Sequence, residues 1–84
     1  MDQALAAEAA REALIHVNKR ILESTPTTLP KWTITAKPYL KAIAAENYGY
    51  EDPEMCVLYA LDNLSSWRGD DARRIKAALN TAIK

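Results

Sequence analysis

The 84-residue sequence contains no phenylalanine, only one cysteine, one histidine and two glycines. The single cysteine, Cys56, excludes an internal disulfide framework, and Cys56 and His16 together are too few for a zinc site rich in histidine and cysteine. Gly49 and Gly69 are also too few to form a glycine-rich loop that cradles phosphates. We therefore expect no metal and no other cofactor.

The chain also lacks an excess of charge and any long apolar run. Eleven Lys and Arg balance eleven Asp and Glu, which is not the composition of a histone-like protein or a polybasic membrane binder. No apolar stretch approaches the roughly 20 residues that cross a bilayer, and the N-terminus lacks the charge pattern of a secretory signal. With 49% hydrophobic and 26% charged residues, the sequence predicts one globular domain in the cytoplasm, away from membranes.

What is present is helical periodicity. It predicts an all-α fold, a small four-helix domain over residues 1–84 with helices at about 4–23, 36–48, 53–65 and 70–83. The first helix has an apolar stripe centred on Leu14, alanine-rich first turns that are expected to fray, and His16 and Arg20 directed to solvent.

Prolines and threonines interrupt this pattern after the first helix. Pro26, Pro30 and five threonines between residues 24 and 35 predict a long extended connector, followed by a helix capped by Thr35 and ended by Gly49. The segment Asp52-Pro53-Glu54 is a strong helix start. The apolar helix that it opens, with Leu61 in the core, is expected to be the central one.

Residues that could carry chemistry are few, and we predict no catalytic site and no enzyme. His16 is expected on the surface, and Cys56 is expected to be a buried structural thiol. The acidic cluster Glu51, Asp52 and Glu54 fits helix capping better than a cation site, because it lacks the alternating ligands around a glycine of calcium-binding loops.

The aromatic residues point to protein binding. All six Trp and Tyr residues lie between positions 32 and 67, and these residue types are enriched at protein interfaces. The interface candidates are Trp32, Tyr50, Trp67 and Arg68. Our main hypothesis is a non-catalytic interaction or regulatory domain that binds another protein or itself, a homodimer being one form.

The alternative hypothesis is a nucleic-acid-binding or transcription-modulating module that uses the third helix, the turn and the fourth helix. Its candidate residues are Arg73, Arg74, Lys76 and Lys84. The acidic start of the fourth helix, Asp70-Asp71, weakens this hypothesis, because base contacts usually form at that end.

The strings KPYLKAIAAENYGY and VLYALDNLSSWRGDDARRIKAALN resemble small uncharacterised proteins of bacteriophage and mobile-element genomes. The shared features are a Pro-Tyr-Leu start and a Trp-Arg-Gly before Ala-Arg-Arg-Ile-Lys. The resemblance covers roughly the last 48 residues and excludes the first helix. It implies a phage-type or bacterial cytoplasmic origin, and it implies no activity and no functional residues.

Overall fold

The computed structural model describes all 84 residues and contains four α-helices and no strands. Helix α1 spans Gln3–Glu23, α2 spans Lys31–Ala44, α3 spans Pro53–Asn63 and α4 spans Asp70–Ala82. The predicted all-α four-helix fold with a connector after the first helix is therefore confirmed. None of the four helices combines the length and apolar character needed to cross a membrane.

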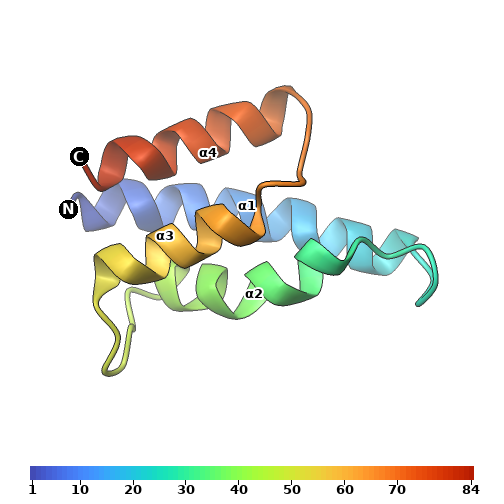
Figure 1. Cartoon of the computed structure of the whole chain (residues 1–84), viewed down its shortest axis with the longest axis horizontal. Helices are drawn as coiled ribbons and strands as arrows, with labels where there is room; N and C mark the ends of the chain where they lie inside the picture. Colours follow the sequence, from blue (N-terminus) through green and yellow to red (C-terminus); the bar gives the residue numbers. More distant parts are fainter.

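Helix α1 lies between α2 and α4 and packs against both (Figure 1). The Arg11 guanidinium donates a hydrogen bond to the Ala44 carbonyl at the end of α2 (3.1 Å). The Asp2 amide donates to the Ala82 carbonyl at the end of α4 (2.7 Å). Helix α3 packs mainly on α2 and barely meets α4. The central helix is thus α1, and the prediction that the third helix is central was wrong.

The alanine-rich start of α1 is part of the core and is not frayed. Ala6, Ala9, Ala10 and Ala13 are all buried, and the Asp2 carboxylate caps the helix by accepting the Leu5 amide (3.0 Å). Alanine has little apolar surface of its own, but its small side chain lets a neighbouring helix approach closely. For this reason the prediction that these turns would fray, which was based on their small apolar surface, was wrong.

The remainder of the core is contributed by all four helices and the turn after α3. Its largest fully buried side chains are Leu40, Ile43, Leu64, Ile75, Leu79, Val17, Val57 and Thr33. Leu61 is only partly buried, and its neighbours Leu58 and Tyr59 are exposed, which reflects the outer position of α3. Leu22, in the last turn of α1, is 86% exposed.

Helix α2 begins five residues and ends four residues earlier than predicted, so the connector spans only residues 24–30. Pro30 occupies the N-cap position, and the Thr33 hydroxyl and amide both donate to its carbonyl. Trp32 to Thr35 alternate like a strand in sequence, but burial of Thr33 and Ala36 on one helix face overrides that local preference. Thr35 is therefore not the N-cap.

Within α2, Pro38 lies in the helix rather than in its first turn. Pro38 and Ile34 are both exposed, so water can hydrogen-bond the Ile34 carbonyl that proline leaves without a donor. The helix ends at Ala44 and not at Gly49.

The end of α2 is a Schellman motif. The Asn47 amide donates to the Ala42 carbonyl and the Glu46 amide donates to the Ile43 carbonyl. Glu46 has the left-handed backbone conformation (φ 52°) that is usually taken by glycine at this position. The loop that follows is therefore started by a defined hydrogen-bonded turn.

We expect Leu64→Ala to lower the free energy of unfolding by about 2–5 kcal/mol, because Leu64 is fully buried in a close-packed core. Leu22→Ala is the matched control, and its effect should stay within about 0.5 kcal/mol because that side chain faces solvent. Urea melts of both variants measure the difference, and equal losses would contradict the assignment of the core.

Candidate binding groove

Three of the four predicted interface residues meet where α1 ends and α2 begins. Here the last turn of α1, the start of α2 and the α3–α4 turn border a groove of about 310 Å³. We call it the tryptophan groove, and its lining residues are Arg20, Pro30, Trp32, Ser66, Trp67 and Arg68. Its volume lies at the lower end of ligand sites, which suits one side chain and its flanking backbone better than a large cofactor.

Four side chains stack against one another at this groove. The Arg20 guanidinium lies over the Trp32 ring, 5.6 Å from its centroid. The Trp32 and Trp67 rings stack with centroids 5.4 Å apart. The His16 ring packs at a tilt against Trp67, and their ring centroids are also 5.4 Å apart. Stacking and cation–π contacts of this kind hold flat surfaces in fixed orientations.

Trp67 is 3% exposed and belongs to the core, so only a small part of it reaches the groove. Its amide donates to the Leu64 carbonyl (2.9 Å), and its carbonyl accepts a hydrogen bond from the Lys76 ammonium (2.7 Å). Gly69 then takes a left-handed backbone conformation (φ 115°) that starts α4. The sequence placed Trp67 among interface candidates, but in the structure it is the buried support of Trp32.

The groove carries two free positive charges. Arg20 and Arg68 are both exposed, and neither forms an ion pair, because the four ion pairs of the molecule involve other basic residues. A guanidinium can bind a carboxylate with two parallel hydrogen bonds. The groove therefore offers an aromatic surface together with two arginines that have no ion-pair partner.

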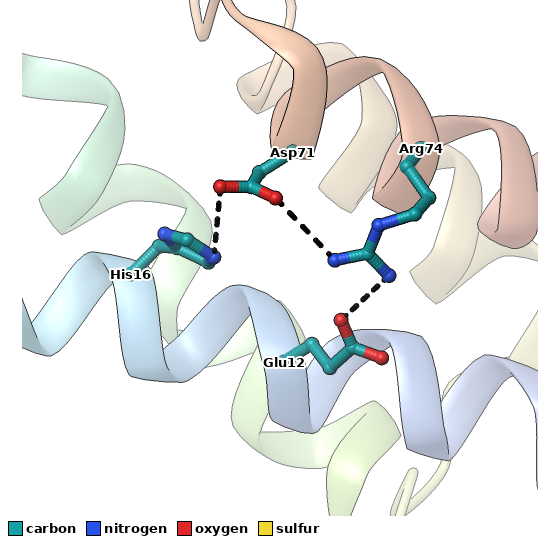
Figure 2. A network of polar contacts seen from close by, with 4 residues as sticks. All are labelled: Glu12, His16, Asp71 and Arg74. Carbon is teal, nitrogen blue, oxygen red and sulfur yellow. Dashed lines mark ion pairs between the residues drawn. The ribbon is translucent and has the colours of Figure 1, made fainter.

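A polar network joins α1 to α4 beside the groove (Figure 2). The Arg74 guanidinium binds the Glu12 carboxylate (2.7 Å) and reaches the Asp71 carboxylate (3.5 Å). These contacts raise the pKa of Arg74, the Glu12 hydrogen bond being the largest cause. Asp71 also lies 3.9 Å from Nε2 of His16. Arg74 and Glu12 border a second, smaller hollow of about 200 Å³ between the two helices.

The nucleic-acid candidates are largely occupied by contacts within the molecule. Arg73 pairs with Asp70 and Arg74 pairs with Glu12 and Asp71. The Lys76 ammonium donates to the carbonyls of Leu64 and Trp67. Lys84, at the other end of α4, has no such partner. This arrangement does not favour the fourth helix as a phosphate-binding surface.

Tyr50 is the interface candidate that does not join the groove. It lies in the loop between α2 and α3, at the opposite end of the bundle (Figure 1), and its side chain is fully exposed. Tyr48, two residues earlier, is partly buried against the core.

Nucleophiles are not brought together. Cys56 is buried as predicted, and burial, followed by the nearby Glu51 and Asp52 charges, raises the pKa of its thiol. A raised pKa favours the unreactive thiol form. No three His, Cys, Asp or Glu side chains gather closely enough to hold a metal ion.

Sequence reasoning missed Arg20 and placed His16 on the open surface, whereas His16 is partly buried against Trp67. Both continue buried rows of α1 at a spacing of seven residues. Arg20 follows Ala6 and Ala13, and His16 follows Ala9. This spacing is present in the sequence, but it indicates the positions of Arg20 and His16 only when the buried face of α1 is centred on these alanines instead of on Leu14.

Comparisons of this chain with protein-family models, with curated proteins and with solved structures find no match. The resemblance to small phage and mobile-element proteins therefore remains an expectation from the sequence.

We expect Trp67→Ala to lower the free energy of unfolding by about 3–5 kcal/mol, because it removes a buried indole that contacts both α1 and α2. Tyr50→Ala is the aromatic control on the exposed loop and should change stability by less than about 0.5 kcal/mol. Urea melts compare the two. A small effect of Trp67→Ala would show that its stack is dispensable.

Alkaline pH is expected to destabilise the fold through Cys56 and Tyr48. Burial is the largest cause that raises the pKa of each group in the folded chain. As the pH rises, the unfolded chain therefore loses these protons at a lower pH than the folded chain does. The stability that the two groups contribute is complete below their ordinary pKa values, and it is lost as the pH rises through their raised pKa values in the folded chain. Urea melts at neutral and alkaline pH should show this loss, and Cys56→Ala should reduce it. An equal loss in Cys56→Ala would contradict the role of the thiol.

Proposed function

We propose that this protein is a non-catalytic binding protein whose tryptophan groove recognises an acidic segment of a polypeptide. An aromatic or other apolar side chain of that segment contacts the part of Trp32 that Trp67 and Arg20 leave exposed, and its carboxylates bind Arg20 and Arg68. The observation that carries the proposal is that two arginines without ion-pair partners line the same groove as a partly exposed tryptophan.

The composition of the groove supports a protein ligand. Trp and Arg are the residues most often found as binding hot spots, where an aromatic ring is desolvated and a charge is paired across the interface. Trp32 is held in place by Trp67 beneath it, so little side-chain freedom is lost on binding. Arg20 is already positioned by its contact with the same ring.

The rest of the molecule supports a role without catalysis. The His16 imidazole contacts Trp67 and Asp71, neither of which is a hydroxyl or a thiol, whereas nucleophilic catalysis pairs a base with such a group. Cys56, the only thiol, is buried and has a raised pKa.

A peptide titration tests this function. The probe is a blocked synthetic peptide with one tyrosine between glutamates, and the signal is tryptophan fluorescence, since Trp32 and Trp67 are the only tryptophans and both line the groove. We expect saturable binding that weakens between about 50 and 200 mM salt. Trp32→Ala should lower the affinity by about 2 kcal/mol, roughly 30-fold.

Charge variants provide the control for this titration. Arg68→Glu should abolish most of the binding, whereas Lys84→Glu changes the net charge equally at the opposite end of the molecule (Figure 1) and should leave it intact. The same peptide with lysines in place of glutamates should not bind. Equal binding of both peptides, or an unchanged affinity of Arg68→Glu, would show that the groove does not select acidic segments.

A further inference from the structure

An acidic loop with an exposed tyrosine lies at the end of the bundle opposite the tryptophan groove (Figure 1). We call residues 46–54 the acidic tyrosine loop. It contains Glu46, Glu51, Asp52 and Glu54, and none of these four carboxylates forms an ion pair. No Lys or Arg occurs between residues 42 and 67. The loop therefore carries four carboxylates and no basic residue of its own, and the Arg11 guanidinium lies at the Ala44 carbonyl just before its start.

The loop holds Tyr50 in an outward position. At its start Glu46 closes the Schellman motif of α2, and at its end the Asp52 carboxylate accepts the Glu54 amide and caps α3. Between them the Glu51 amide donates to the Tyr48 carbonyl (3.0 Å). Tyr48 packs inward while Tyr50 is fully exposed. A backbone fixed at both ends reduces the entropy that would be lost when Tyr50 binds.

The acidic tyrosine loop has the features that the tryptophan groove is proposed to recognise. An aromatic ring is flanked directly by carboxylates in Tyr50-Glu51-Asp52, and the groove presents Trp32 between elements that carry Arg20 and Arg68. Charged surfaces of opposite sign steer association and set its orientation. The two surfaces lie at opposite ends of a molecule 36 Å long (Figure 1), so a loop cannot enter the groove of its own chain.

We propose that the partner of the tryptophan groove is a second copy of this chain, whose acidic tyrosine loop enters the groove with Tyr50 against the exposed part of Trp32. The proposal rests on the proposed function of the groove. Each copy uses two different surfaces, so the contact is head-to-tail. Such contacts close into a ring of two or more copies, or continue as an open chain with a free groove at one end and a free loop at the other. Because one loop would fill a groove of only about 310 Å³, we expect the association to be weak and reversible.

Sedimentation velocity of the full chain over a concentration series tests this self-association. We expect the average mass to rise above that of the monomer with concentration, and to fall back when the salt concentration is raised. Tyr50→Ala and Arg68→Glu should each weaken association by about 30-fold or more. Both side chains are exposed, so neither variant disturbs the core. Lys84→Glu is the charge control and should associate like the original chain.

Mixing variants distinguishes a head-to-tail contact from any other. Tyr50→Ala keeps its groove and Arg68→Glu keeps its loop, so a mixture of these two monomeric variants should form a species of two chains and nothing larger. A mixture of Arg68→Glu with Trp32→Ala, which both lack a working groove, should stay monomeric. Failure of the first mixture to associate would overturn the proposal.

The outcomes also separate this proposal from the proposed function. A chain that binds the glutamate–tyrosine peptide but stays monomeric at every concentration would overturn self-association and leave the function of the groove intact. A chain that self-associates equally well with Tyr50→Ala and Arg68→Glu would overturn the proposed contact. Loss of peptide binding and self-association together in Arg68→Glu, but not in Lys84→Glu, supports both.

Discussion

Trp67 contacts α1 and α2 through its indole and is tied to the end of α3 and to α4 through its backbone. Its ring stacks on Trp32 of α2 and touches His16 of α1, its amide binds the Leu64 carbonyl after α3, and its carbonyl accepts the Lys76 ammonium of α4. Burial of one large side chain in a turn thus fixes the turn, and the turn fixes where α4 lies against α1. The groove is a consequence of this packing. The buried Trp67 ring supports Trp32, and the Trp32 ring in turn supports the Arg20 guanidinium.

The basic residues of α4 and those of the groove differ in their partners. Along α4, Arg73 and Arg74 bind carboxylates, while Lys76 binds backbone carbonyls. Arg20 and Arg68 lie at the groove without such partners. Ion pairs between exposed side chains contribute little to stability. What matters here is that Arg20 and Arg68 are not part of any of them. Arg20 and Arg68 thus lie at one end of a chain of zero formal net charge, and the four carboxylates of the acidic tyrosine loop lie at the other.

Local signals predicted the helices well where strong boundaries exist. The Asp52-Pro53 start and the acidic start at Asp70 are where α3 and α4 begin. The predicted bounds of α2 were wrong at its start because that start depends on the burial of Thr33 beneath other helices, which no local preference encodes. Its end depends on Glu46 adopting a left-handed conformation that sequence reasoning expects at glycine. Trp32, Trp67 and Arg68 were selected by residue type alone, and only the structure shows that they line one groove.

The sequence by itself determined the all-α class, the number of helices, the buried thiol and the residue types from which a binding surface could be built. These properties follow from periodicity, capping residues and composition, which act over a few neighbouring positions. Only the tertiary structure decided that α1 is central, that Trp67 is a core residue, and that Arg20 joins Trp32 and Arg68 at one groove. Those outcomes depend on contacts between residues distant in the chain, where small alanines allow close helix packing and one buried indole sets the position of its neighbours.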